Sequence, residues 1–202
     1  MAVPREAEQV TTLELFFDLV FVFAITQVTA LMAEDPTWAG MGRGMLVLSA
    51  LWFAWTAYAW LTNTINPDEG GARLAIFAIM AALLIASLAV PHAFDDDAVI
   101  FGAAYLFVRA MHIVLYALAA RSDPTLRFVV RQLAPSMLGA GVLVFVAGLV
   151  HGEARYLLWI ASLLVPAALL FLRGVDGWRL HPGHFAERHG LIVIIAIGES
   201  IV

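Results

Sequence analysis

The chain has 202 residues, of which 62% are hydrophobic and 13% are charged, and its formal net charge is −5. Soluble domains are about half apolar and about a quarter charged, so a mean hydropathy of +0.90 excludes an ordinary soluble protein and indicates an integral membrane protein. The absence of cysteine excludes disulfides and cysteine-ligated metal sites, and the acidic charge balance includes no basic stripe that would bind nucleic acid.

Six apolar stretches are long enough to cross a membrane, since a hydrocarbon core of about 30 Å needs about 20 helical residues. They are residues 11–32, 40–62, 73–92, 98–120, 126–150 and 154–172. A seventh apolar run begins near Leu191 and reaches only about 18 Å before Val202. The sequence therefore predicts an all-α, polytopic transmembrane helix bundle with six complete spans plus a partial seventh. We expect residues 1–202 to be a single integral membrane domain and the N-terminal part of a longer chain.

The arginines predict the orientation of the bundle, because cytoplasmic loops of membrane proteins carry an excess of basic residues. All 11 basic residues are arginine. With a cytoplasmic N-terminus, the outer side holds only Arg43 and Arg155, and Arg109 lies inside a span. The cytoplasmic side then holds Arg5, Arg73, Arg121, Arg127, Arg131, Arg173, Arg179 and Arg188. We therefore predict a multi-pass protein of the bacterial inner membrane with the N-terminus inside, in contact with the lipid bilayer.

The first predicted span contains two acids, Glu14 and Asp18, which share one helical face because they lie four residues apart. Thr11 and Glu14 also match a capping box, which explains Glu14 as well as a polar pathway does. Asp18 lies about 10 Å past the helix start, where a charge costs on the order of 2.5–3.5 kcal/mol. It must find a cation, hydrogen-bond donors or a proton.

The fourth predicted span contains a polar stripe at steps of four, three and four residues. The stripe consists of Tyr105, Arg109, His112 and Tyr116. These side chains share one helical face, which in a membrane span should point into the bundle. Counted from the cytoplasmic end, His112 and Arg109 lie about 12 and 16 Å deep, so we expect one of them to pair with Asp18.

Glu199, in "LIVIIAIGESIV", is expected about 18 Å deep if its helix starts near Glu187. The acids of the first and seventh spans and the bases of the fourth would then meet at one level. A buried ion pair that only fixes helix register is one explanation of this cluster. The other is a proton relay, since His112 can change protonation near neutral pH and the acids outnumber the single arginine.

Two further features concern the packing of the later spans. The stretch "PSMLGAGVLVFVAG", Pro135 to Gly148, is rich in small residues that let helices approach closely. Pro135 and Pro166 should kink their helices, as in a moving gate or, more simply, a packed bundle.

Two segments resemble a known family. The segments "ELFFDLVFVFAITQ" (Glu14–Gln27) and "HFAERHGLIVIIAIGES" (His184–Ser200) resemble the bacterial low temperature requirement protein A family. The resemblance implies a polytopic inner-membrane protein, usually longer than this chain, with acidic motif residues at Glu14, Asp18, Glu187 and Glu199. The aromatic-x-Asp-x-Val-Phe pattern of the first span also resembles a group of atypical bacterial and lysosomal potassium channels with six-span repeats.

Three functions are compatible with these residues. The first is a transporter or ion pathway for a proton, an ion or a small molecule, lined by Glu14, Asp18, Tyr105, Arg109, His112, Tyr116 and Glu199. The second is a non-transporting membrane scaffold or stress-related sensor, in which the buried charges only fix helix packing.

The third is a membrane enzyme with zinc in the loop "HPGHFAERH", where His181, His184 and His189 flank Glu187. Their spacing matches no established metal motif, and residues that precede a helix explain the loop equally well. No glycine loop for nucleotides and no H-E-x-x-H motif is present, so we expect no cofactor.

Overall fold

The computed structural model describes residues 12–62, 70–173 and 182–199, and every regular element in these residues is a helix. The seven α-helices are α1 (Thr12–Glu34), α2 (Trp38–Thr62), α3 (Gly70–Leu88), α4 (Ala98–Ala119), α5 (Pro124–Leu149), α6 (Glu153–Arg173) and α7 (Pro182–Glu199). Two short 3-10 helices, η1 (Val90–His92) and η2 (Ala120–Ser122), lie in the connections on either side of α4. The predicted all-α class is confirmed, and each predicted span lies within a few residues of a helix.

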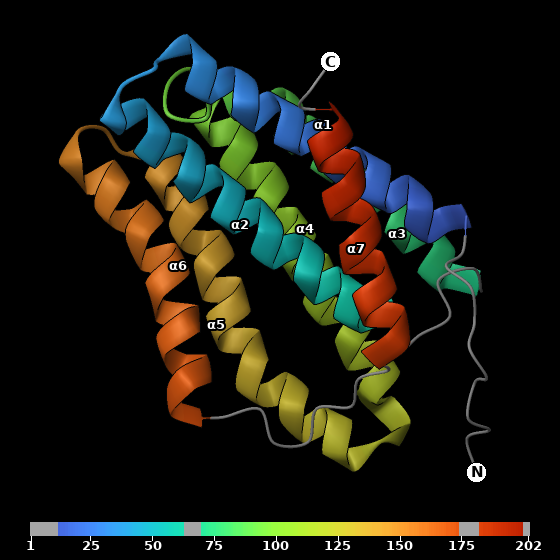
Figure 1. Ribbon diagram of the computed structural model, residues 1–202. Coiled ribbons are helices and arrows are strands. Elements are labelled where there is room, and N and C mark those ends of the chain that lie inside the picture. The colour runs from blue at the N-terminus through green and yellow to red at the C-terminus, as the bar shows by residue number, and fades with distance from the viewer. Residues whose placement is uncertain (1–11, 63–69, 174–181, 200–202) are drawn as a thin grey trace.

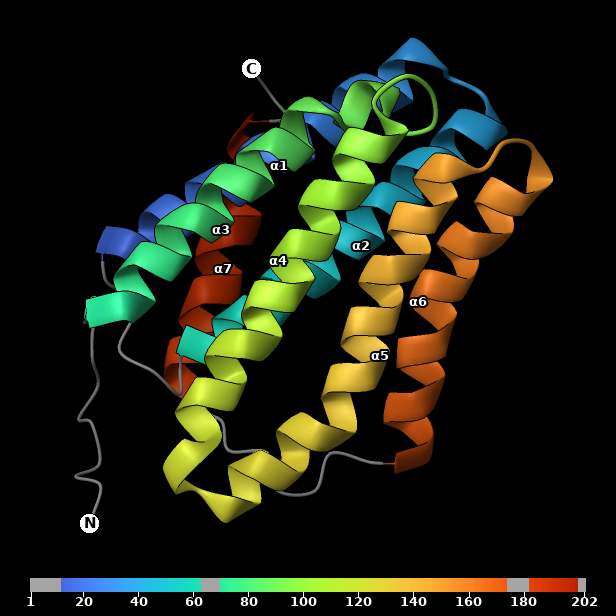
Figure 2. The same ribbon diagram turned by 180° about the vertical axis from the view of Figure 1, so that it is seen from behind.

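The helices form one bundle in which α2 is the central element (Figure 1). On one side of it, α1 packs against α2, α3 and α7. On the other side, α4, α5 and α6 pack in chain order, and both α4 and α6 return to contact α2. Figure 2 shows the reverse face, where α4 crosses in front of α2 and α3 lies in front of α1 and α7. Side chains on α2 therefore face two different halves of the bundle.

Five helices in the described part of the chain are long and apolar enough to cross a membrane, namely α1, α2, α3, α4 extended through Ser122, and α5. The chain is thus a multi-pass integral membrane protein. α6 has 21 residues, and α7 contains a shorter apolar stretch, Arg188–Gly198. The finer count of six complete spans and a partial seventh remains a prediction. α3 also ends at Leu88, earlier than predicted, because Pro91 falls in the short helix η1.

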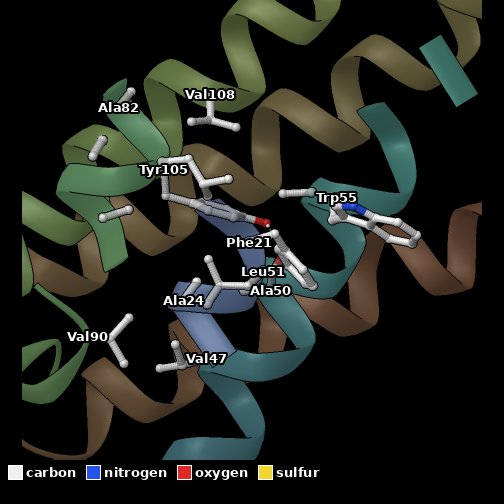
Figure 3. Packing of buried hydrophobic residues seen from close by; sticks show 14 of the residues in the cluster. Phe21, Ala24, Val47, Ala50, Leu51, Trp55, Ala82, Val90, Tyr105 and Val108 are labelled. Carbon is white, nitrogen blue, oxygen red and sulfur yellow. Dashed lines mark hydrogen bonds between the residues drawn. The ribbon is translucent and has the colours of Figure 1, made fainter. Parts of the chain in front are cut away.

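The helices expose large apolar side chains, aromatic as well as aliphatic, which is the pattern of a protein dissolved in lipid. Trp55 of α2 stacks on Phe21 of α1, with ring centroids 5.6 Å apart. Figure 3 shows these rings beside Leu51 and Tyr105 in the interior. On the outer face of α1, Phe16 and Leu19 are more than half exposed. Such side chains would be unfavourable in water, whereas acyl chains solvate them.

Small residues bring α4 and α5 into backbone contact, as the glycine-rich stretch predicts. A Cβ atom on Gly102 would lie 2.7 Å from the Phe145 Cα, and one on Gly148 would lie 2.6 Å from the Ala98 carbonyl oxygen. Both distances are below van der Waals contact, so only glycine permits this spacing of the helices. This close pair forms one wall of the cavity described below.

Pro135 lies inside α5 and Pro166 inside α6, so both prolines are helix-internal as predicted. Figure 2 shows that α5 changes direction between its first turns and the remainder of the helix. A proline removes one helical hydrogen bond and clashes with the preceding turn, which accounts for such a bend. The bend moves the first turns of α5 away from α6.

The connections between helices carry their own polar contacts. Asp123 caps α5 by accepting hydrogen bonds from the Thr125 and Leu126 amides, with Pro124 in the first turn. Between α1 and α2, the Thr37 hydroxyl and the Arg43 guanidinium both hold the pKa of Asp35 below its usual range. These capping contacts explain why the turns predicted from sequence are also the observed ones.

Arg155, which the sequence predicts at the outer end of the sixth span, is buried. Its guanidinium donates to the carbonyls of Ala147 and Val150 at the end of α5, and to that of Phe94 before α4. The last carbonyls of a helix carry partial negative charge, so they compensate the buried cation. Arg155 therefore fastens α6 to the ends of its neighbours.

Candidate functional site

Asp18 pairs with Arg188 of α7, and the predicted pairing of Asp18 with Arg109 or His112 is wrong. The Asp18 Oδ1 atom lies 2.6 Å from Arg188 Nη2, and Oδ2 accepts from Nε at 3.3 Å. The indole N–H of Trp55 donates to the same Oδ1 at 2.7 Å. Asp18 is 2% exposed and Arg188 is 1% exposed, so this is a two-point ion pair closed off from its surroundings.

Glu14 and Thr62 complete this ion-pair cluster, which we define as Glu14, Asp18, Trp55, Thr62 and Arg188. The Arg188 Nη1 atom lies 3.3 Å from Glu14 Oε1 and donates to the Thr62 hydroxyl at 2.7 Å. Two carboxylates from α1 thus converge on one guanidinium from α7, with α2 supplying the neutral donors and acceptors. Thr11, the other half of the predicted capping box, lies outside the described residues.

The sequence does not predict Arg188 as a partner of Asp18, because the apolar run of the seventh span begins only near Leu191 and Arg188 is expected on the cytoplasmic side before it. In the structure, α7 begins at Pro182, so Arg188 lies about 9 Å inside the helix. A signal was present in the sequence: Ile192, four residues later and fully buried, continues the same helical face. An arginine in line with a buried apolar stripe indicates an inward-facing charge.

The stripe on α4 is buried inside the bundle on the opposite side of α2. Tyr105, Arg109 and His112 are 2%, 4% and 3% exposed. The Tyr105 hydroxyl donates to the Ala50 carbonyl at 3.1 Å, and Figure 3 shows the ring directed from α4 toward α2. In return, the Tyr58 hydroxyl of α2 donates to the Val108 carbonyl at 2.7 Å. These reciprocal hydrogen bonds hold α2 and α4 in register.

Arg109 has only carbonyl and aromatic partners in the part of the chain that is described. Its Nε donates to the Met137 carbonyl at 3.4 Å and its Nη1 to the Phe53 carbonyl at 3.3 Å, both long hydrogen bonds. The guanidinium carbon also lies 5.8 Å from the Tyr105 ring centre. Among described residues no carboxylate lies within ion-pair distance of Arg109. Arg188, in contrast, lies within ion-pair distance of two carboxylates.

One of the two ring nitrogens of His112 has a hydrogen-bond partner in the described part of the molecule. Its Nε2 lies 3.0 Å from the Ala57 carbonyl, and its ring packs between Tyr58 and Tyr116, with centroid distances of 5.1 and 5.3 Å. The Nδ1 atom is buried and has no hydrogen-bond partner in the described part of the molecule. The same holds for the hydroxyl of Thr56 on α2. Unsatisfied polar atoms are unfavourable in an apolar interior, so both need a partner from elsewhere.

These unsatisfied groups line a cavity of about 550 Å³ whose walls come from α2, α4, α5 and α6. Its walls are mainly aromatic and aliphatic, and its polar lining residues are Thr56, Tyr105, Arg109, His112, Tyr116, Ser136 and Ser162. Both helix-internal prolines lie close to it, since Pro166 is in the wall and Pro135 precedes Ser136. Four of the predicted pathway residues therefore meet at one cavity, and Asp18 and Glu14 do not.

α2 separates the two polar regions. Trp55 points toward Asp18, and Thr56, the next residue, lines the cavity. A single helix thus carries adjacent contacts to the ion-pair cluster on one side and to the cavity on the other. The predicted single level of converging charges is corrected to two separate regions with α2 between them.

The remaining candidates fall partly outside what is described. His181 lies outside the described residues, as do the side chains of His184, Glu187 and Glu199. His189 packs edge-on against Trp55, with ring centroids 4.7 Å apart. In the described residues no group of three or more His, Cys, Asp or Glu could hold a metal ion.

Comparison with known proteins identifies the family. The sequence signature of the family described as bacterial low temperature requirement A protein (LtrA) matches residues 9–202. The chain belongs to the LtrA family. A curated relative, "Uncharacterized protein RA0937" of Rhizobium meliloti (strain 1021), is 29% identical over 200 residues, which cover 94% of this chain and 49% of the relative. The chain thus spans about half the length of that relative, and no solved structure matches it.

Proposed function

We propose that this LtrA-family chain forms part of a pathway that moves a small solute or an ion across the bacterial inner membrane. The cavity beside Arg109 and His112 is the observation that carries the proposal. Arg109 lies about 16 Å along α4 from Ala98, near the middle of the helix. Ionisable groups at that depth usually face a pathway or a solute site, and transporters bind their substrates near mid-membrane.

The ion-pair cluster supplies a means of coupling in this proposal. Protonation of Asp18 would neutralise its carboxylate and weaken the two-point contact with Arg188 that holds α7 against α1. The same carboxylate accepts the Trp55 N–H, and Thr56 on the next position of α2 lines the cavity. A proton taken up on one side of α2 would therefore change the position of a cavity wall.

The arginine distribution supports a cytoplasmic N-terminus for the pathway. The α3–α4 connection contains Asp95, Asp96 and Asp97 and no arginine, whereas the α4–α5 connection contains Arg121. These two connections lie at opposite ends of α4. The excess of arginine on one side supports a cytoplasmic position for the α4–α5 connection.

The proposal is tested by measuring transport currents in proteoliposomes on a solid-supported membrane. Rapid exchange to K⁺, Na⁺, chloride, acetate, mandelate or a different pH should give a current above that of protein-free liposomes for at least one solute. Asp18→Asn should reduce the pH-driven component at least tenfold. Arg121→Gln, which alters an exposed arginine in a connection, should leave the current unchanged.

A non-transporting scaffold or sensor is the second candidate. The observation that favours it is the complete pairing of Asp18, which resembles a register lock between α1, α2 and α7. In that case no solute gives a current above the protein-free level. Folded wild-type protein that is silent for every solute would contradict the transport proposal. A pH-driven current that Asp18→Asn leaves intact would contradict the coupling role of Asp18.

A further inference from the structure

We infer that the cavity between α2, α4, α5 and α6 binds a small organic anion that has a carboxylate, an apolar body and a hydrogen-bond donor beside the carboxylate. The binding site stands on the geometry alone. Its assignment as the substrate of a transport cycle rests on the proposed function. A cavity of about 550 Å³ with mainly apolar walls and a few polar groups is typical of small-molecule sites.

The charge of the ligand follows from Arg109. Three arginines are buried among the described residues, namely Arg109, Arg155 and Arg188, and their partners differ. Arg188 faces two carboxylates, and Arg155 faces the carbonyls at a helix end. Arg109 has two long hydrogen bonds to carbonyls inside helices, where each carbonyl also accepts a helical hydrogen bond. A buried cation in such surroundings calls for an anion, and the planar guanidinium matches a carboxylate.

The donor on the ligand follows from His112. A carbonyl can only accept, so the contact between His112 Nε2 and the Ala57 carbonyl assigns the Nε2–H tautomer to the neutral ring. The buried Nδ1 atom is then an acceptor without a partner among described residues. Because His112 lies three residues after Arg109 on one helical face, the donor must lie close to the carboxylate. A 2-hydroxy acid has this arrangement, and the Thr56 hydroxyl can donate to its carboxylate.

The apolar body follows from the rest of the wall. Phe53 and Trp60 of α2 and Met137 of α5 contribute large apolar surfaces to the same cavity. A ligand with only a carboxylate and a hydroxyl would leave these surfaces facing empty space or water. An aromatic or branched aliphatic group would fill them and add hydrophobic contact.

Binding is measured by isothermal titration calorimetry on the purified, detergent-solubilised chain with four matched probes. Mandelate has all three features. Mandelamide lacks the charge, phenylacetate lacks the hydroxyl, and lactate lacks the aromatic body. We expect mandelate to bind most tightly, phenylacetate and lactate about tenfold more weakly, and mandelamide at least a hundredfold more weakly.

Variants assign the binding to the cavity. Arg109→Gln should weaken mandelate binding at least a hundredfold, and Arg109→Lys should restore part of it. His112→Phe should remove the preference for mandelate over phenylacetate while both still bind, a result that loss of folding would not give. Arg121→Gln is the matched control, and circular dichroism and gel filtration verify that each variant is folded.

The outcomes separate the ligand from the proposed function. Equal binding of mandelate and mandelamide, no binding of any carboxylate, or mandelate binding unchanged in Arg109→Gln would overturn the inference. Carboxylate binding with no current in proteoliposomes would support the site and contradict the transport proposal. A current for K⁺ or Na⁺ without carboxylate binding would support the transport proposal and contradict the carboxylate site.

Discussion

Arg109 and Arg188 are the same residue type, both buried in one bundle, yet their surroundings differ in charge. Arg188 lies against Asp18 and Glu14, so the transfer of its charge out of water is compensated by ion pairs. Arg109 is held by carbonyls and by the face of Tyr105, which orient the guanidinium without neutralising it. The first arrangement stabilises the fold, and the second leaves a cation for a ligand.

Removal of Arg188 should destabilise the bundle strongly. In Arg188→Gln, the Trp55 indole is the one donor that Asp18 keeps among the described residues, and the carboxylate remains buried as an uncompensated charge. Loss of one partner of a buried pair costs about 3–5 kcal/mol, so we expect a decrease of that size in the free energy of unfolding. The measurement is equilibrium unfolding by SDS in mixed micelles.

Two further variants provide the controls for this prediction. Asp18→Asn combined with Arg188→Gln removes both charges of the close pair and should recover part of the lost stability. Arg121→Gln changes an exposed arginine and should stay within about 0.5 kcal/mol of wild type. If Arg188→Gln were as stable as Arg121→Gln, the ion-pair cluster would have no structural role.

At the scale of elements, α2 and the α4–α5 pair have different parts in the bundle. α2 is hydrogen-bonded to α4 through Tyr58 and Tyr105, and it contacts the ion-pair cluster through Trp55. α4 and α5 instead approach backbone to backbone at Gly102 and Gly148. A membrane protein has no hydrophobic driving force between helices in lipid, so such close van der Waals packing largely decides which helices associate.

Gly102→Ala should therefore destabilise the bundle, because the new methyl group would overlap the Phe145 backbone. Overpacking of this kind costs about 1–3 kcal/mol. Gly139→Ala in α5 is the matched control, since a Cβ there would meet nothing within 4 Å. Alanine also favours helix by up to about 1 kcal/mol over glycine, so the control should be neutral or stabilising. Thermal unfolding of both variants in the same detergent makes the comparison, and equal melting temperatures would refute the close contact.

For the whole molecule, the protein presents large apolar side chains outward and keeps Asp18, Arg109 and Arg188 inside. Phe16 and Leu19 lie on the outer face of the helix that turns Asp18 inward. The bilayer explains both the outward apolar side chains and the inward carboxylate, because lipid solvates apolar groups and offers no water to a charge. The same bundle can therefore hold two separate polar regions, one closed by an ion pair and one open to a ligand.

The orientation of the bundle can be tested by cysteine labelling, because the chain contains no cysteine of its own. Asp96→Cys and Ser122→Cys introduce exposed sites at opposite ends of α4. With a cytoplasmic N-terminus, a membrane-impermeant maleimide should label the Asp96→Cys variant in intact cells. It should label the Ser122→Cys variant only after lysis. The reversed pattern would invert the topology, and labelling of both in intact cells would contradict a spanning α4.

The sequence alone determined the membrane class, the helical elements, the inward direction of Asp18 and the polar stripe of α4. These properties depend on transfer out of water and on helical periodicity, which are local to each segment. Only the tertiary structure decided which charges meet, because pairing depends on how helices distant in the chain cross. It placed Arg188 against Asp18 through an early start of α7, and it left Arg109 facing a cavity on the far side of α2. A one-turn difference in where a helix begins moves a charge by about 5 Å, and that is enough to change its partner.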